Sequence, residues 1–455
     1  MVPIKPADQN FGKYVLSSMV TMFLQSAYSI VDGLFVSNLI NDTALSAINV
    51  AWPIIAVITA IGTGIGCGGA VIMSTQQGAG HREESNRVRG NIILALAAAG
   101  LLCTAVSLAL LEPLLRLMGA RDELLGYAIA YGRIMLAGGT VQVLSCGLTP
   151  LLRNDNRAVT AMAIMVGGLL VNLGLDFAFM TVFRWGIEGA AAASLCAQLF
   201  TVVSCLFVLV GKRDGPLRLD QLRPQGIYWP RIFLNAVSPF GISLTPSLLI
   251  LYHNVACMNS GSDLAVNAYA LITSTVGSYR ILLIGVADGI QPLASYANGA
   301  RDLDGLRRIR SKAILTAVSA SALLFLFTLA TAQFYPGLYG YTGQAATLGL
   351  HAVLLTSAQL IFTGLVRVTN SFFYAVGKLP YSLFMIYFDP LVMTPLALLI
   401  LPRLFGLDGI WLTAVVTQLL LNVKAVWMFL LHSQELRRLE RDSQDIHEEG
   451  SVLRG

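Results

Sequence analysis

The sequence predicts an all-α polytopic membrane protein, with twelve transmembrane helices arranged as two pseudo-symmetric six-helix bundles. Three observations lead to this prediction: the low charge of the chain, twelve long apolar stretches, and an internal repeat of 221 residues. Of the 455 residues, 55% are hydrophobic and only 12% are charged, whereas a soluble domain carries about 25% charged residues. The chain has too little polar surface to fold in water, so we expect a lipid bilayer to surround much of it.

Each apolar stretch is long enough to cross a bilayer as a helix. A spanning helix needs about 20 mostly apolar residues, because hydrocarbon offers the backbone no water to bond with. The stretches do not alternate in polarity and are too long for the strands of a transmembrane barrel. The first lacks a cleavage site after a short apolar core, so we expect a retained helix there. The predicted spans are 12–40, 46–76, 88–112, 123–150, 157–183, 187–211, 230–259, 264–298, 311–335, 345–376, 379–402 and 408–432.

The distribution of Lys and Arg predicts the orientation of the chain. If the N-terminus is cytoplasmic, the inner segments hold 22 basic residues and the outer segments hold four. This bias follows the positive-inside rule, so we expect both termini in the cytoplasm. The same bias accounts for the net charge of +5, which gives no reason to expect nucleic-acid binding.

The internal repeat predicts how the spans are grouped. Sliding the sequence by 221 positions aligns identical residues in corresponding spans, such as Gly78 with Gly299. Each half has an even number of spans, so both halves enter the membrane from the same side and the repeat is parallel. Two such halves around a central cavity are typical of alternating-access transporters. The predicted units are an N-terminal lobe at 1–211, a cytoplasmic linker at 212–229, a C-terminal lobe at 230–432 and a charged, solvated cytoplasmic tail at 433–455.

Ionisable residues inside the first half form one candidate site. A charge in hydrocarbon is costly, so an ionisable residue within a span is a candidate for a functional role. Asp32 and Asp176 lie at a similar depth in the outer part of this half. Asn172 lies one helical turn from Asp176, and Ser194 of the sixth span lies at the same level. Carboxyl groups shielded from water exchange protons near neutral pH, and their oxygens also suit sodium. Helix–helix hydrogen bonding is the structural alternative.

A second group of titratable residues lies in the C-terminal half. Asp288, Arg367 and Asp389 each lie roughly ten residues from the cytoplasmic end of their span, where an ion pair closing an inner gate and substrate binding are alternatives. His253 is offset by 221 from Asp32, so it is a candidate for the cavity wall or for a hydrogen-bonded core histidine. The other intramembrane bases are interpreted as charge partners or snorkelling groups, and they are Arg133, Arg280 and Lys424.

The remaining motifs exclude several functions. Gly64, Gly66 and Gly69 form a GxGxxG pattern, but it lies inside a span with no strand before it, so we interpret these glycines as helix-packing positions. The sequence contains no GxxxxGK[ST], HExxH or GxSxG motif, so we expect no enzyme, no catalytic residues and no cofactor. The six cysteines lack CxxC spacing and are expected to be buried free thiols: Cys67, Cys103, Cys146, Cys196, Cys205 and Cys257.

Six short motifs are spread over both halves of the chain. They are Val31–Ser37 (a VDT-type signature), Leu152–Arg157 (an R-N-D-G-N-P-K turn), Asn172–Asp176 (N-x-x-x-D), Gly186–Ala191 (G-x-x-G-A-A), Gly289–Pro292 (G-x-Q-P) and Phe373–Lys378 (Y-F-Q-A-x-G-K). Together they resemble the multidrug and toxic compound extrusion (MATE) family. The resemblance extends along the whole chain, although each motif alone is weak.

The resemblance implies a secondary transporter that exports cationic or amphipathic drugs or toxic metabolites by antiport with H+ or Na+. It assigns the coupling site to Asp32, Asn172 and Asp176, with Ser194 where a threonine is usual. If the coupling ion is sodium, it would bind Asp32, Asn172 and Asp176. The resemblance also implies a monomer in the cytoplasmic (inner) membrane of a bacterium, with a small organic cation and the lipid bilayer as partners.

Two other functions remain alternatives at the level of sequence. A flippase for lipid-linked saccharides of the same superfamily would use basic residues for a pyrophosphate group, and Arg133, Arg280 and Arg367 suit this role. A non-transporting membrane receptor or enzyme is an alternative from a different class, but no catalytic cluster faces either surface. A major facilitator carrier fits less well, because the loop at 77–91 lacks the G-x-x-x-D-R-x-G-R-R pattern.

Overall fold

A computed structural model gives the structure of the protein and describes residues 10–39, 42–211, 217–260 and 263–452. Within these ranges, the side chains at 26–39, 42, 45, 219, 263 and 436–452 lie outside the description. The chain is helical along nearly all of the described length, as expected for a bilayer solvent in which backbone groups must bond within their own segment.

The first half consists of six spans that follow the predicted ranges closely. Two of the spans are composite: α4 and α5 meet at a bend of 58°, and α6 continues into a π-helical turn, η2. The elements are α1 (Phe11–Leu39), α2 (Asp42–Gly78), α3 (Arg82–Leu117), α4 (Asp122–Ala137), α5 (Gly139–Asn154), α6 (Ala158–Asp176), η2 (Phe177–Val182) and α7 (Gly186–Val210).

The second half repeats this plan after the short linker helix η3. Again the fourth span is bent, by 42° between α12 and α13, and the fifth contains a π-helical turn, η5. The elements are η3 (Leu219–Leu222), α8 (Trp229–Asn259), α9 (Asp263–Gly299), α10 (Leu303–Thr331), η4 (Ala332–Phe334), α11 (Tyr335–Leu338), α12 (Gly343–Ser357), α13 (Gln359–Ala375), α14 (Leu379–Phe388), η5 (Asp389–Met393), α15 (Thr394–Phe405) and α16 (Leu407–Val452).

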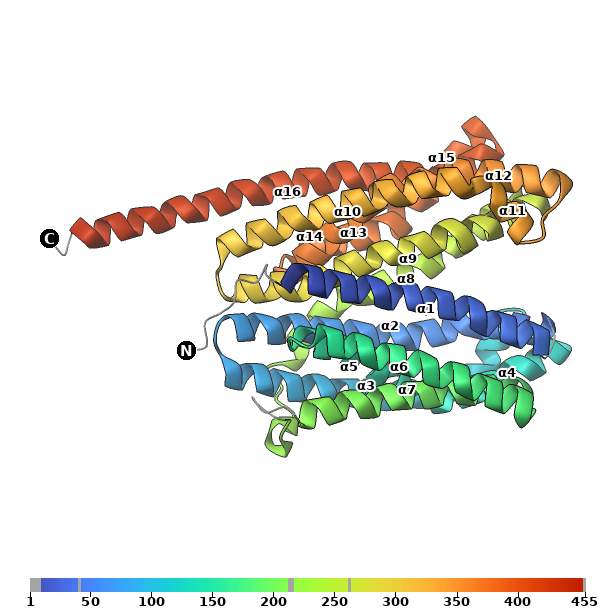
Figure 1. The fold of residues 1–455 in the computed structure, drawn as a ribbon, viewed down its shortest axis with the longest axis horizontal. Coiled ribbons are helices and arrows are strands. Elements are labelled where there is room, and N and C mark those ends of the chain that lie inside the picture. The colour runs from blue at the N-terminus through green and yellow to red at the C-terminus, as the bar shows by residue number, and fades with distance from the viewer. Residues whose placement is uncertain (1–9, 40–41, 212–216, 261–262, 453–455) are drawn as a thin grey trace.

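The two halves form two helical bundles that lie side by side along the long axis of the molecule (Figure 1). Among the residues the structure describes, nine helices and the two bent pairs are long and apolar enough to cross a membrane. Helix α1 completes the twelve predicted spans. We call the end at which α1 begins and α16 ends the terminal end, and the opposite end the far end (Figure 1). The turns at 79–81, 155–157 and 300–302 lie at the terminal end.

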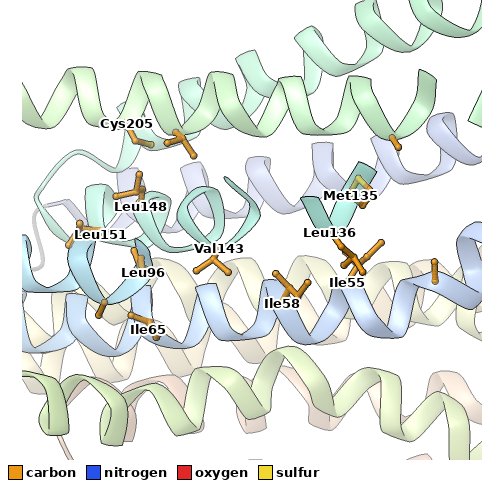
Figure 2. Close-up of a cluster of buried hydrophobic side chains, with 14 of the residues drawn as sticks. Ile55, Ile58, Ile65, Leu96, Met135, Leu136, Val143, Leu148, Leu151 and Cys205 are labelled. Carbon is orange, nitrogen blue, oxygen red and sulfur yellow. The ribbon is translucent and has the colours of Figure 1, made fainter. Parts of the chain in front are cut away.

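The core of the N-terminal lobe lies where α2 packs against α3, α4 and α5 (Figure 2). Ile55, Ile58 and Ile65 recur at helical spacing along α2, so they present one apolar stripe to these partners. Leu96 and Leu148 face the same cluster and are fully buried. Cys205 also belongs to this apolar cluster (Figure 2).

The two lobes meet through pairs of glycines that are 221 residues apart. A Cβ atom at Gly68 would lie 2.6 Å from the backbone nitrogen of Ala236, and one at Gly289 would lie 2.6 Å from the Cα atom of Val15. Ala236 and Val15 are themselves 221 residues apart. Helices α2 and α8 therefore pack as α9 and α1 do, which confirms the sequence repeat as a structural one.

A second glycine pair brings the lobes together at the terminal end. A Cβ atom at Gly78 would collide with the carbonyl oxygen of Tyr296, and one at Gly299 would collide with that of Thr75. Thr75 and Tyr296 also differ by 221 positions. Only glycine allows the backbones of α2 and α9 to approach this closely. We call the contact formed by Thr75, Gly78, Tyr296 and Gly299 the terminal seam.

The linker between the lobes is held against the N-terminal lobe. Asn91 on α3 accepts hydrogen bonds from the backbone N–H of Gln225, at 2.8 Å, and from Nε1 of Trp229, at 3.1 Å. Its amide nitrogen donates to the carbonyl oxygen of Arg223 at 3.3 Å. The buried Asn91 therefore holds residues 223–229 against α3.

The charged tail, which was expected to be a solvated end, continues α16 as a helix to Val452 and extends beyond the bundle (Figure 1). Charged residues such as Glu, Lys and Arg are good helix formers, so a span can continue into water without a break. Of the free cysteines, Cys205 and Cys257 are buried as expected, whereas Cys196 is exposed on α7.

Candidate functional site

The structure brings together part of the predicted coupling site in the N-terminal lobe. Asn172 and Asp176 lie one turn apart on α6, and Nδ2 of Asn172 donates to Oδ2 of Asp176 at 2.8 Å. Asp176 has no exposed surface and Asn172 has 6%. Ser194 is half-buried on α7, the helix that packs along α6. Asp32 lies on α1, but its side chain is outside the described residues, so its approach to this pair stays a prediction.

Asp176 is also the last residue before the π-helical turn η2. A π-turn replaces the regular i→i−4 hydrogen bonds and is frequent at functional sites. In the C-terminal lobe, Asp389 is the first residue of the π-helical turn η5. The fifth span of each lobe thus has a buried aspartate next to an interrupted helix, a similarity that the alignment at 221 positions does not reveal.

The C-terminal lobe contains a cavity of about 250 Å³ enclosed by α8, α9, α12, α13, α16 and the η5–α15 segment. Three of the four predicted gate or cavity residues line it: His253, Arg367 and Asp389. Arg280, which sequence reasoning treated as a partner or snorkelling group, lines it as well. The cavity therefore combines two guanidinium groups, one carboxylate and one imidazole.

Hydrogen bonds hold the acidic residue of this cavity in position. Asp389 Oδ1 accepts from the Thr394 hydroxyl at 2.8 Å, and Oδ2 accepts from Nε2 of Gln418 at 3.1 Å. Asp389 is 4% exposed, so both carboxylate oxygens have neutral donors in place of water. Asp389 lies within electrostatic range of Arg280 and Arg367. Within the described part of the chain, however, neither guanidinium makes an ion pair with it to 4.0 Å.

Aromatic rings form the part of the cavity toward the far end. The His253 ring stacks on Tyr269 with centroids 5.2 Å apart, and Tyr269 stacks on Trp411 at 6.4 Å. Nδ1 of His253 donates to the carbonyl oxygen of Leu249 at 2.8 Å, because a carbonyl can only accept. In the neutral ring, Nε2 is then an acceptor. Both sequence interpretations of His253 apply, since it is hydrogen-bonded in the core and also lines the cavity.

Asp288, the fourth predicted gate residue, lies outside this cavity and joins the two lobes. Its carboxylate pairs with Nη1 of Arg153 at 3.2 Å. The sequence had grouped Asp288 with Arg367 and Asp389 of the same lobe, but its ion-pair partner in the structure belongs to the opposite lobe. Next to this pair, the amides of Asn154 and Gln291 exchange two hydrogen bonds of 2.9 and 3.0 Å. Both amide side chains are buried.

These contacts explain two of the sequence motifs. Arg153 and Asn154 belong to the Leu152–Arg157 motif, and Gln291 belongs to the Gly289–Pro292 motif. The carbonyl oxygen of Pro292 also accepts a hydrogen bond from the Ser74 hydroxyl at 3.2 Å. The two motifs therefore meet across the lobe boundary and close the terminal end of the molecule.

The residues that sequence reasoning missed have weak local signals. Tyr269, Trp411 and Gln359 line the cavity, but each lies in an apolar span where an aromatic or amide residue is unremarkable. Arg153 belongs to the Leu152–Arg157 motif, but no contact with the other lobe was predicted for it. Their roles depend on contacts between helices that are distant in sequence.

Twelve helical spans in two parallel, pseudo-symmetric bundles, with buried charged groups in both, define a polytopic membrane transporter. The MatE family model matches residues 17–178 and 243–399. These ranges cover more than half of the chain, so the chain belongs to the MatE family.

Similar curated proteins agree with this family. The multidrug export protein MepA of Staphylococcus saprophyticus is 24% identical over 397 residues, which are 86% of this chain and 86% of that protein. MepA of Staphylococcus aureus is 23% identical over 459 residues, which are 98% of this chain and 97% of that protein.

Solved structures show the same fold. One is an outward-facing multidrug resistance MATE family transporter of the MOP superfamily, with a TM-score of 0.90 and 23% identity over 95% of this chain and 97% of that chain. Another is a MOP superfamily transporter from Pyrococcus furiosus described as having a binding pocket of reverse polarity, with a TM-score of 0.89 and 23% identity over 95% and 97%.

Proposed function

We propose that this transporter exports cationic or amphipathic small molecules and takes up H+ or Na+ in exchange. The family and the curated relatives, which are named as multidrug export proteins and match along nearly the whole chain, support this proposal. The observation that carries the coupling step is the buried Asn172–Asp176 pair next to a π-helical turn.

The pair has the chemistry that coupling requires. An ionised carboxylate away from water is costly unless it is matched by donors or a cation. Binding of a proton or Na+ would neutralise Asp176, and a positively charged substrate would do the same in the alternate state. Competition between the two for Asp176 and Asp32 gives each ligand a different affinity for the inward and outward states, which is what drives the exchange.

Alternating access requires the terminal end to open and close. The Arg153–Asp288 ion pair and the Asn154–Gln291 amide pair join the lobes there, so the inward-open state must break these contacts. We propose that the terminal end faces the cytoplasm of a bacterium across its inner membrane, as the charge bias favours, and that the protein acts as a monomer.

Proteoliposomes test the coupling directly. Purified protein is reconstituted with a fluorescent organic cation, and H+ and Na+ gradients are imposed separately. The gradient that drives efflux identifies the coupling ion. We expect Asp176→Asn and Asp32→Asn to slow gradient-driven efflux at least about tenfold, because each removes a group that binds the ion. Asp220→Asn, at an exposed linker position, is the control. Wild-type efflux by both site variants would refute the assignment.

The flippase alternative has one supporting and one opposing observation. Arg280 and Arg367 line a common cavity, as a pyrophosphate group would require. Arg133, the third base on which that alternative depended, is exposed on α4 of the other lobe. Movement of a fluorescent isoprenyl pyrophosphate lipid between leaflets of the same proteoliposomes distinguishes the two functions.

A further inference from the structure

The C-terminal cavity has a charge pattern that the proposed cation exchange does not use. Its lining residues include two arginines and one aspartate, with no other Asp, Glu, Lys or Arg among them. The lining therefore carries a net charge of +1 when His253 is neutral. Arg367 is 9% exposed. It lies within electrostatic range of Arg280, and the two positive charges repel each other.

Neither guanidinium forms an ion pair with a carboxylate within the described residues. Asp389 lies within electrostatic range of both arginines and Asp288 within that of Arg367, but the two oxygens of Asp389 already accept from Thr394 and Gln418. In the described portion of the chain, the side chains of Arg280 and Arg367 make no hydrogen bond and no ion pair to 4.0 Å. Guanidinium groups held in low-dielectric surroundings without an anion are costly. A second negative group would offset that cost.

Other polar atoms around the cavity also lack partners. Among the residues the structure describes, no hydrogen bond is made by Nε2 of His253, Nε1 of Trp411 or the Thr356 hydroxyl. All three residues line the same cavity. Buried polar groups are normally satisfied, so these three atoms are exceptions among the residues that surround the cavity.

The position of these groups along the helices gives the cavity two ends. Tyr269 and Trp411 lie six and four residues from the far ends of α9 and α16, whereas Asp389 lies ten residues from the terminal end of α14. With a rise of about 1.5 Å per residue, the stacked rings lie near the far end and the charges lie deeper. An aromatic body next to Tyr269 and Trp411 would thus direct an acidic group toward Arg280 and Arg367.

From this geometry we propose that the C-terminal cavity binds an aromatic organic anion, or the anionic end of a zwitterionic amphiphile, with its acidic group on Arg280 and Arg367. Arg forms bidentate, charge-assisted hydrogen bonds with carboxylates. The volume of about 250 Å³ is below the roughly 300–1,000 Å³ of drug-sized ligand sites. The cavity therefore fits a small ligand or one end of a larger one. This site goes beyond the proposed coupling and does not depend on it.

Three probes with the same aromatic body test the proposal. Full-length protein in lipid nanodiscs is dialysed to equilibrium at neutral pH against 2-naphthoate, 2-naphthylmethanol or 2-naphthylmethylammonium. We expect naphthoate to bind at least about tenfold more tightly than the ammonium, and the alcohol to be intermediate. An ammonium that binds as tightly as naphthoate would overturn the proposal.

Variants locate the site. Arg280→Gln and Arg367→Gln should each weaken naphthoate binding about tenfold, whereas Arg133→Gln, an exposed intramembrane arginine of the other lobe, should not. Asp389→Asn keeps both guanidiniums and removes the competing carboxylate, so naphthoate should bind more tightly in it. Asp389→Asn tests whether the anion binds in this cavity even if an arginine variant does not fold. Unchanged naphthoate binding in the folded arginine variants, or weaker binding in Asp389→Asn, contradicts the assignment. Equilibrium binding needs no gradient, so loss of coupling in Asp176→Asn with naphthoate binding retained separates the two proposals.

Discussion

Arg153 of α5 and Asp288 of α9 form an ion pair of 3.2 Å that joins the two lobes at the terminal end. The two side chains are 12% and 34% exposed, so water screens the pair in part. Each residue comes from a different half of the repeat, and the contact exists only while this end is closed. The ion pair therefore stabilises the closed state relative to the open state more than it stabilises the folded state relative to the unfolded one.

The first prediction concerns that equilibrium. Asp288→Asn should raise the open population by up to roughly fivefold, because partly exposed ion pairs contribute about 0.2–1 kcal/mol. Spin labels at His81→Cys and Arg301→Cys, in the turns of opposite lobes, report the opening in a cysteine-free background. Glu112→Gln, which breaks an exposed pair with Arg116 within α3, should leave the distance distribution unchanged. An unchanged distribution in Asp288→Asn would show that the pair does not bias the equilibrium.

The second prediction concerns the terminal seam. Gly78→Ala and Gly299→Ala should each destabilise the closed state by about 1–3 kcal/mol, because the added methyl meets a backbone carbonyl. The same label pair should report more of the open state in both. Gly126→Ala on α4 is the matched control, since nothing lies within 4 Å of its added Cβ atom. If Gly126→Ala opened the terminal end equally, the steric explanation would fail.

The third prediction concerns the buried amide pair. Asn154→Leu alone leaves the Gln291 amide without its partner, which costs about 1–3 kcal/mol. Gln291→Leu should cost a similar amount. The double variant should recover part of the loss, because two apolar groups then face each other. Melting temperatures in detergent for the four members of this cycle measure the coupling, and additive losses would mean that the two amides act independently.

The fourth prediction concerns the link between α3 and the linker. Arg89 pairs with Asp155 at 3.7 Å, with both side chains 1% exposed, and it donates to Oε1 of Gln221 at 3.2 Å. Arg89→Leu should lower stability by about 3–5 kcal/mol, as expected when one partner of a buried pair is removed. It should also speed proteolysis of the linker. Arg87→Leu, at an exposed position of the same helix, is the control, and equal proteolysis of the two variants would refute the prediction.

Much of the fold could be predicted from the sequence. Span length and charge bias depend on the bilayer and not on particular contacts, so each predicted span overlaps a helix or a helix pair of the structure. The ends were less well located, since α10 begins at Leu303 where 311 was predicted and α16 ends at Val452 where 432 was predicted. The repeat aligned Gly78 with Gly299, and the structure places both glycines at equivalent contacts between the lobes, but the sequence did not show that these contacts join the lobes. The bend at Ala358 had no such signal, since alanine favours a straight helix. The packing of neighbouring helices decides where such a bend falls.

Depth along the spans grouped Arg367 with Asp389, and both line one cavity, but a direct contact was predictable only where both residues lie on one helix. Asn172 and Asp176 are four residues apart, so the helical period places them together. Arg280, Asp389 and Trp411 come from three separate helices, and the sequence carries no information on which way each side chain turns. The pairing of Asp288 with Arg153 depends in addition on how the two lobes dock, which no periodicity reveals.

The contacts at the terminal seam have the form of an isologous interface. Gly78 meets the residue equivalent to Thr75 in the other lobe, and Gly299 meets Thr75 itself. In a symmetric dimer, one surface patch binds its own copy in this way. The two lobes of the chain thus meet as the two subunits of a symmetric dimer do. The atoms nearest to a side chain added at Gly78 belong to the opposite lobe. The two halves can therefore differ in their buried charges, whereas a substitution in the seam of one lobe requires a compensating substitution in the other.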